Sequence, residues 1–294
     1  QMGNDLPPLL AEVGVDYFEE LAQKEWQTTT KFRIFIDRGP RHSPELVQRY
    51  DLDVMAADVD LPTVGRVDLV VVADFDKGLV TAKLLAELAG TLRDVAWLVD
   101  SKNPEIAGWA FSEQLTQRPT LFLNREEFAR ISTEPPTDPA YYYGPNDHFL
   151  NGRWSHIKEQ LLKAATDFHA RHPRWDLVVK LDRDGAVAFW MDEGLWKFAR
   201  RAAPSIERAL GIGAGDAFMA GWIAATRARS PKGDQLAEAS VYARGWIEVA
   251  EAAHDLTIPS EVVGTSGFEK ARSDAPALVA DQGDVSEQLT DLRA

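Results

Sequence analysis

Apolar positions along the chain fall into short continuous runs and into longer segments with a repeat of three to four residues. The run 67–74 (VDLVVVAD) predicts a strand of a parallel sheet that is buried on both faces. Two further strands are predicted over 95–100 (VAWLVD) and 120–123 (TLFL). The longer segments predict helices over 79–92, 155–171, 216–229 and 236–254. This alternation of strands and helices is typical of an α/β fold.

Two other stretches predict β-hairpins. Within 28–51 the segment FRIFI alternates in the manner of a strand, a Gly-Pro turn follows, and a second strand-like piece ends at Asp51. Residues 176–190 (DLVVKLDRDGAVAFW) predict a strand, an Asp-Gly turn and a strand. Residues 9–24 predict a helix, a break and a second helix. From residue 265 onward the chain is rich in Ser, Asp and Gly, which predicts a tail that frays or wraps the surface.

Composition narrows the classes of function. The chain has 294 residues, a formal net charge of −14 and no cysteine, and its length suffices for one α/β core with a small appendage. An acidic surface argues against nucleic acid or an anionic membrane as a main partner. No apolar run approaches the ~20 residues of a membrane span, and the first residues do not resemble a signal peptide. The lack of cysteine excludes disulfides and thiol catalysis and fits a reducing cytoplasm.

The histidines give no catalytic or metal-binding pattern. His169 and His172 form the only pair at helical spacing, and no further His or acidic ligand lies near them in the sequence. We therefore expect neither a zinc site nor a Ser-His-Asp arrangement.

The most informative stretch is 210–222 (LGIGAGDAFMAGW), where a Gly-rich turn runs into an apolar helix. Free backbone N–H groups at the start of such a helix suit a phosphate or a phosphoryl group in transfer. Asp216 stands at the mouth of this turn, where a carboxylate can take a proton from an attacking hydroxyl. The alternative interpretation is that the glycines and the Asp form only a loop and an N-cap.

The run GAGDAFMAGW resembles the C-terminal signature of the ribokinase-like (PfkB) carbohydrate kinases, GAGDxF followed by a helix of small residues. The resemblance implies a ribokinase-like three-layer α/β/α sandwich with a mainly parallel sheet and a small β lid. It also implies that Asp216 is the catalytic base and that the backbone of Gly213, Ala214 and Gly215 forms the anion hole. Leu210-Gly211 stands where the family usually has Asp-Thr, which helps to form a monovalent-cation site in many members.

Two further motifs resemble those that form the nucleotide-binding site in the same family. Asn124 with Glu127 matches the family's NxxE motif, in which the Glu places Mg²⁺ through water, and the same spacing predicts a capping box. The 176–190 hairpin matches the position of the family's TxGxxG turn, which implies nucleotide contacts by Lys180, Asp182 and Gly185. Asp182 replaces a glycine, and Lys180 replaces Thr, where it would pair with a phosphate or with Asp182.

The lid region resembles heptose-phosphate kinase members in particular. TTTKFR followed by QRYD implies that Lys31, Arg33 and Arg49 meet an anionic sugar, although solvated strand charges explain them equally well. The run ADFDKGLVT is similar to the heptose-kinase motif DYGKGxLT, with Asp76 in place of its first Gly. It implies that Asp74 and Lys77 lie where the substrate is bound, at the carboxyl end of a strand.

The resemblance covers about residues 28–255 and lacks what precedes the lid in family members, namely a first strand, an acidic substrate-binding residue and a Gly-Gly motif. Either the chain is a fragment, or another chain supplies this part, or the protein has kept the fold and lost sugar kinase activity. An unpaired strand edge is an aggregation hazard unless it is covered. We therefore expect a homo-oligomer or a complex with another subunit.

These observations predict four segments: an N-terminal helical segment (1–27), a β lid hairpin (28–60), a ribokinase-like core (61–264) and an acidic C-terminal tail (265–294). The leading hypothesis is a cytoplasmic phosphotransferase that uses ATP and Mg²⁺ to phosphorylate a hydroxyl of a sugar or sugar phosphate. The alternatives are a pseudokinase that acts as a scaffold or subunit, and a nucleoside kinase.

Overall fold

The structure is a computed structural model that describes residues 11, 30–36, 45–52, 65–103, 105–132, 150–203, 213–253 and 280–291. Most of the predicted 9–24 helices and the Leu210-Gly211 pair lie outside these residues.

Seven strands form one sheet in the order β3-β4-β5-β6-β7-β8-β9. Five of them (β3, β4, β5, β6 and β8) run in one direction, and β7 and β9 run in the other. The strands are β3 (Leu69–Asp74), β4 (Ala96–Ser101), β5 (Thr120–Asn124), β6 (Asp176–Lys180), β7 (Ala186–Asp192), β8 (Leu195–Arg201) and β9 (Ala280–Asp284).

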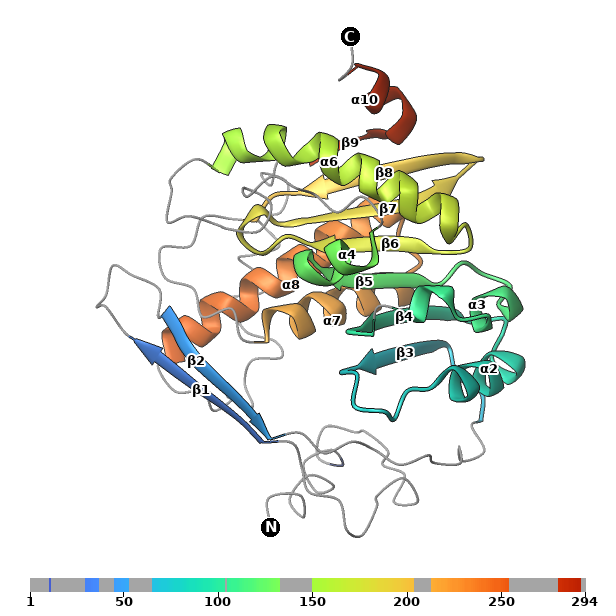
Figure 1. Cartoon of the computed structure of the whole chain (residues 1–294), viewed down its shortest axis with the longest axis horizontal. Helices are drawn as coiled ribbons and strands as arrows, with labels where there is room; N and C mark the ends of the chain where they lie inside the picture. The colour runs from blue at the N-terminus through green and yellow to red at the C-terminus, as the bar shows by residue number, and fades with distance from the viewer. Residues whose placement is uncertain are drawn as a thin grey trace.

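Helices cover both faces of this sheet (Figure 1). One layer contains α2 (Ala82–Thr91), α3 (Phe111–Gln114), α4 (Arg125–Ile131) and α6 (Leu150–Arg171), together with the short helix η3 (Ile106–Gly108). The other contains α7 (Ala214–Arg227) and α8 (Lys232–Ala253). The three-layer α/β/α sandwich that the sequence predicts is therefore the observed fold.

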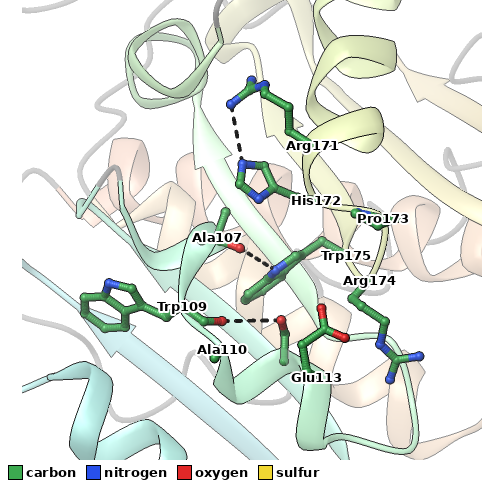
Figure 2. A pocket seen from close by; sticks show the side chains of 11 residues that line it. Ala107, Trp109, Ala110, Glu113, Arg171, His172, Pro173, Arg174 and Trp175 are labelled. Carbon is green, nitrogen blue, oxygen red and sulfur yellow. Dashed lines mark hydrogen bonds between the residues drawn. The ribbon is translucent and has the colours of Figure 1, made fainter.

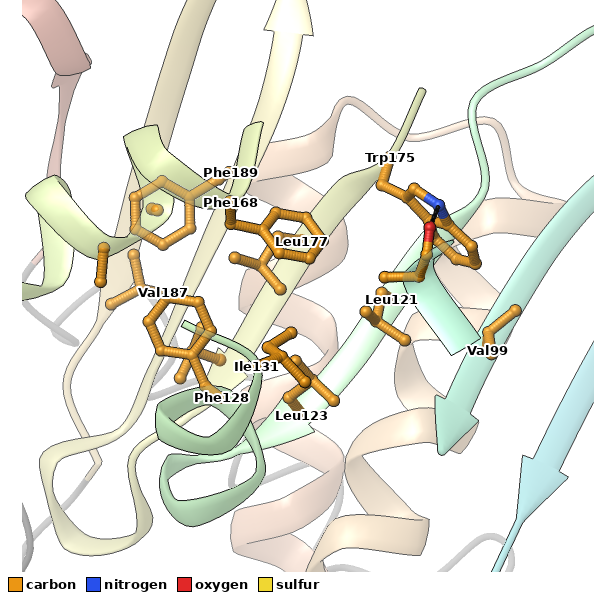
Figure 3. Close-up of a cluster of buried hydrophobic side chains, with 14 of the residues drawn as sticks. Val99, Leu121, Leu123, Phe128, Ile131, Phe168, Trp175, Leu177, Val187 and Phe189 are labelled. Carbon is orange, nitrogen blue, oxygen red and sulfur yellow. Dashed lines mark hydrogen bonds between the residues drawn. The ribbon is translucent and has the colours of Figure 1, made fainter. Parts of the chain in front are cut away.

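The alternation of side chains along each strand divides the core between these layers. In β6, Leu177 and Val179 pack with the first layer, where aromatic rings such as Phe168 fill the space between α6 and the sheet (Figure 3). Val178 lies on the other face, in the cluster in which Trp222 of α7 meets the sheet. Because both faces are buried, the strand reads as a continuous apolar run.

Strand β3 departs from the prediction that it is buried on both faces. Among the strands that the structure describes, it is the edge strand and pairs with β4 alone. Val72 is buried against the first helix layer, but Val71 on the opposite face is 43% exposed. The reason is that α7 and α8 pack on side chains of β4 to β8, whereas in β3 only Leu69, at the start of the strand, packs partly against that cluster. Phe75 and Leu79, which follow the strand, are also exposed.

The N-terminal part of the described chain forms a separate hairpin, whereas the C-terminal part adds a strand to the main sheet. Strands β1 (Thr30–Ile36) and β2 (Glu45–Leu52) form the predicted hairpin as a separate antiparallel sheet, on the side toward which β3 and β4 point (Figure 1). At the C-terminal end, β9 pairs with β8 and is followed by α10 (Val285–Asp291). Of the two alternatives for the tail, fraying or wrapping the surface, fraying is therefore wrong for residues 280–291, because β8 offers an edge with which β9 pairs.

Helices α7 and α8 lie unusually close because Gly221 stands at their contact. A Cβ added to Gly221 would lie 2.8 Å from Cα of Ala239 and 2.9 Å from the carbonyl oxygen of Glu238. No side chain at position 221 fits without moving one helix away from the other. The position of α7 relative to the sheet therefore depends on this glycine.

We expect Gly221→Ala to lower the free energy of unfolding by about 1–3 kcal/mol, because the added methyl group overpacks the contact between α7 and α8. Urea unfolding followed by circular dichroism measures the change. Gly233→Ala is the matched control, because a Cβ at Gly233 meets nothing within 4 Å, and its stability should stay equal or rise slightly. Equal losses in the two variants would contradict the close contact at Gly221.

Candidate active site

Three polar side chains meet where the parallel strands end. Asp100, Asn124 and Lys180 stand at or next to the carboxyl ends of β4, β5 and β6, and Asn124 is opposite Lys180 in the strand register. Each stands two positions after an apolar residue that packs beneath α7 and α8 (Leu98, Phe122 and Val178), and therefore lies on that same face of the sheet. In open α/β sheets this edge is where ligands bind.

Lys180 forms an ion pair with Asp100 across the end of the intervening strand β5. Its Nζ atom lies 2.6 Å from Oδ2 of Asp100, and the Lys180 side chain is 19% exposed. The sequence suggested Asp182 as one partner of this lysine. The structure adds Asp100 as an ion-pair partner, because the strand order brings that carboxylate within reach of the ammonium group.

The Gly-rich turn ends beside this ion pair. Gly213 is the N-cap of α7 with a φ of 81°, and a Cβ there would lie 2.8 Å from Nε1 of Trp246 in α8. Glycine offers no side chain to cap the helix, so Gly213 leaves the first-turn N–H groups of Ala214, Gly215 and Asp216 without a side-chain cap. A Cβ added to Gly215 would lie 3.9 Å from Nζ of Lys180, and the Asp216 side chain is exposed.

The capping box that the sequence predicts is present at the start of α4. Glu127 N donates to Oδ1 of Asn124 at 2.8 Å, and Asn124 N donates to Oε2 of Glu127 at 2.7 Å. Burial raises the pKa of the Glu127 carboxyl, while the Asn124 N–H group and the Lys180 ammonium act in the opposite direction. Glu127 is therefore a buried carboxylate close to the Lys180–Asp100 pair.

A buried ion pair fixes the turn between β6 and β7, which contains the short helix η4 (Asp182–Asp184). Nη2 of Arg125 donates at 2.5 Å both to Oδ2 of Asp184 and to the carbonyl oxygen of Leu181. Gly185 has a φ of 92°, and a Cβ there would lie 1.9 Å from the carbonyl oxygen of Arg201, so only glycine fits.

Asp182 occupies the position in this turn at which the TxGxxG motif has a glycine. Its φ of 54° is a left-handed conformation, in which Asp is less strained than most residues. The side chain is 78% exposed and its Oδ2 lies 3.9 Å from Nε of Arg125. Arg125 thus offsets part of the negative charge that Asp182 adds to this turn.

Asp74 lies at the end of β3, on the face opposite to Lys180, and is buried. Its Oδ2 accepts from Oγ of Ser101 at 2.7 Å and its Oδ1 accepts from N of Asp76 at 2.9 Å. Asp76 takes a left-handed φ of 57°, so this Asp adopts a conformation that glycine favours. These contacts give Asp74 a structural role in joining β3 to β4, and a substrate contact stays a prediction, as it does for Lys77 in the turn after β3.

The three predicted cationic residues of the lid, Lys31, Arg33 and Arg49, lie in strands β1 and β2, and the strand register gives their positions. In the β1–β2 register Arg33 is opposite Arg49, and Lys31 is opposite Asp51. A role for them in binding an anionic sugar stays a prediction.

The described residues include no group of three or more His, Asp or Glu side chains that would hold a metal ion by themselves. Glu127 and Asp100 are carboxylates of the kind that Mg²⁺ contacts when nucleotide phosphates and water complete its coordination. The donor set therefore fits a magnesium ion that arrives with a nucleotide. Within the same residues, no helix has the length and apolar character needed to cross a membrane.

A shallow depression of about 280 Å³ lies at the other end of the sheet, where β6 begins (Figure 2). Its two arginines already have partners within the chain: Arg171 binds Asp167 and the carbonyl oxygen of Ile131, and Arg174 donates to the carbonyl oxygen of Leu115. Nε1 of Trp175 donates to the carbonyl oxygen of Ala107 at 2.9 Å. The candidate active site and this depression are thus at opposite ends of β6.

Three residues of the site, Asp100, Arg125 and Asp184, are not among the site residues predicted from the sequence. Asp100 ends the predicted strand VAWLVD, and its place at a carboxyl end is the signal that would have singled it out. Arg125 and Asp184 carry no such signal, because their pairing depends on how α4 packs on the turn after β6.

Comparison with known proteins shows the fold and gives no assignment by sequence. No protein-family model matches the chain, and no curated protein matches its sequence. A ribokinase from Cryptococcus neoformans var. grubii serotype A, solved in complex with ADP, superposes with a TM-score of 0.61 and 11% identity, covering 93% of this chain and 79% of that one. A nucleoside kinase from Methanocaldococcus jannaschii, an archaeal member of the ribokinase family, gives 0.54 and 13%, covering 92% and 77%. The chain therefore has the fold of ribokinase-family kinases.

The raised pKa of Glu127 predicts a pH dependence of stability. Because the folded state favours the protonated carboxyl, the contribution of Glu127 is full below the ordinary glutamate pKa and is lost as the pH rises through the raised value. Glu127→Gln keeps an oxygen acceptor for Asn124 N and removes the charge. The free energy of unfolding of Glu127→Gln relative to wild type should therefore rise as the pH increases above the ordinary glutamate pKa of about 4.3.

Glu126→Gln is the matched control, because Glu126 is the exposed neighbour in the same first turn of α4. Its difference from wild type should not show the rise. Thermal unfolding at a series of pH values measures both variants. If the difference in free energy of unfolding between Glu127→Gln and wild type does not change with pH, burial of the charged Glu127 carboxylate does not destabilise the fold.

Proposed function

We propose that the protein is an ATP-dependent phosphotransferase of the ribokinase-like class that phosphorylates a hydroxyl of a sugar or sugar phosphate. The observation that carries this proposal is the meeting of Lys180, Asp216 and the uncapped start of α7 at the carboxyl end of the sheet. An ammonium and several free N–H groups favour an anion at that point, and a carboxylate stands beside them. The fold of ribokinase-family kinases supports the same class of reaction.

Each proposed residue has a separate role in phosphoryl transfer. Asp216 takes the proton of the acceptor hydroxyl, and the N–H groups of the Gly213–Gly215 backbone bind the phosphoryl group that is transferred. Asn124, Lys180, Asp182 and Gly185 line the nucleotide side. Mg²⁺, held through water by Glu127, supplies neutralisation of phosphate charge when it is bound.

The acceptor is proposed from the lid and the turn after β3. The β1–β2 hairpin within residues 28–60 would close over a sugar, and Lys31, Arg33 and Arg49 would favour an anionic one. The resemblance of these motifs to heptose-phosphate kinases supports a sugar phosphate, with Asp74 and Lys77 on the substrate side. The reducing conditions that a cysteine-free chain suits support a cytoplasmic location.

The second candidate function is that of a pseudokinase, which binds a partner as a scaffold or subunit. Asp182 in place of glycine and the exposed edge strand β3 favour this alternative. The two candidates differ in nucleotide binding and catalysis, which a single variant series separates.

Asp216→Asn should lower kcat for phosphoryl transfer about 10²–10⁴-fold and leave the affinity for ATP unchanged, because a general base acts in the transition state. Calorimetry with ATP and Mg²⁺ measures binding, and a panel of sugars and sugar phosphates measures turnover. Asp234→Asn is the control, because Asp234 is an exposed Asp in the first turn of the neighbouring helix α8. Wild-type protein that binds no ATP at millimolar concentration would favour the pseudokinase.

We also propose that the edge strand β3 is covered by a second copy of the chain or by another subunit. Val71 and Phe75 are exposed apolar side chains beside an unpaired strand edge, counted over the described residues. Burying about 100 Å² of such surface contributes roughly 2.5 kcal/mol to association.

Val71→Glu should then shift the protein toward the mass of one chain, 32.7 kDa, because a charge on the edge strand opposes pairing. Light scattering after size-exclusion chromatography measures the mass. Leu195→Glu serves as the control, because Leu195 is 50% exposed at the start of β8, away from the β3 edge. A stable wild-type monomer would argue against a second copy at β3.

A further inference from the structure

The ammonium of Lys180 lies beside the start of α7, and Asp100 is the carboxylate that holds it there. The start of a helix carries partial positive charge, and a cation placed beside it is repelled. Lys180 nevertheless lies beside Gly215 in the first turn of α7, where its ammonium is 3.9 Å from the position of an added Cβ. Two positive groups thus converge on one point.

The fold gains little stability from this arrangement. The Lys180 and Asp100 side chains are only 19% and 27% exposed, and the cost of removing two charges from water offsets much of the attraction in such a pair. Asp100 keeps the ammonium in place at the end of β4 in spite of the helix. The pair is therefore better suited to hold a cation ready for a ligand than to stabilise the fold.

We propose that Lys180 is a catalytic residue that binds the phosphoryl group during transfer, and that Asp100 is its positioning residue. This inference rests on the proposed function and adds a cation to the amides of the anion hole. An ammonium has three N–H donors, so Lys180 can keep its bond to Asp100 and donate to a phosphoryl oxygen at the same time. The charge that builds up in the transition state is then neutralised by Lys180 and by the start of α7 together.

The step balances without a proton change on Lys180. The acceptor oxygen attacks the γ-phosphorus and its proton passes to the Asp216 carboxylate. The bond from the γ-phosphorus to the bridging oxygen breaks, and that electron pair stays on ADP. Lys180 remains an ammonium throughout, so its contribution is electrostatic.

The test compares ground-state binding with binding of a transition-state mimic. ADP with Mg²⁺ and ADP with Mg²⁺ and aluminium fluoride are titrated into wild type, Lys180→Met and Lys180→Arg. We expect Lys180→Met to weaken the aluminium fluoride complex about 100-fold and ADP alone less than about 10-fold, because Lys180 acts on the transferred group. Lys180→Arg, which keeps the charge, should recover part of the loss, and Asp100→Asn should give an intermediate loss.

Lys232→Met is the matched control. Lys232 is 27% exposed and forms an ion pair of the same kind, with its Nζ 3.2 Å from Oδ2 of Asp176, at the opposite end of β6. Its removal should leave both affinities unchanged. Thermal unfolding adds a second readout: ligand-free Lys180→Met should lose little stability if the repulsion between the ammonium and the start of α7 offsets the attraction to Asp100.

The outcomes separate the inference from the proposed function. Wild type that binds neither ATP nor ADP overturns both. If wild type binds both nucleotides and aluminium fluoride tightens ADP binding to Lys180→Met as much as to wild type, the role of Lys180 alone is overturned. The same holds if aluminium fluoride does not tighten ADP binding to wild type. A Lys180→Met variant that loses stability and binds both ligands with one common loss shows that Lys180 is structural.

Discussion

Helix α7 reaches its place only because glycine stands at two of its contacts with α8. Gly221 lets the two helices approach until the backbone of one meets that of the other, and Gly213 leaves room for the ring of Trp246. A larger residue at either position would lift α7 from the sheet, and with it the first turn that faces Lys180. The geometry of the candidate site thus depends on the packing of α7 against α8.

The charged groups of the candidate site come from both the strands and the helices. The strands contribute Asp100 and Lys180, the turn after β5 contributes Glu127, and α7 contributes Asp216 and its free N–H groups. Burial raises the pKa of Glu127 while Lys180 opposes the rise, so these groups respond to one another as a set. An arriving polyphosphate would change the balance for every member of the set.

The features that depend on a local pattern could be predicted from the sequence. The buried strand runs, the capping box at Asn124 and Glu127, the hairpin turn with its Gly185 and the helix after Gly213 each follow from a few adjacent residues. Their chemistry is fixed by spacing along the chain, and the structure confirms that these elements form. The catalytic role of Asp216 stays a prediction that a fold comparison does not test.

The features that depend on strand order could not be predicted in this way. Lys180 and Asp100 are 80 residues apart, and only the order β4-β5-β6 brings them together. The exposure of Val71 depends on which strands α7 and α8 cover. Strand β9 is a polar segment, ADQGD, with no apolar alternation to mark it, and it forms because β8 presents an edge.

The pairing of β9 with β8 has a topological consequence. The chain leaves the sheet after Arg201, passes through α7 and α8, and returns at Ala280 to lie beside the strand that it left. Helices α7 and α8 therefore belong to a long loop whose ends are joined by one antiparallel strand pair. Closing such a loop has an entropic cost that grows slowly with its length, and non-local pairings of this kind form late in folding. Local opening of 280–291 would release the ends of this loop and loosen the anion hole before the rest of the sheet unfolds.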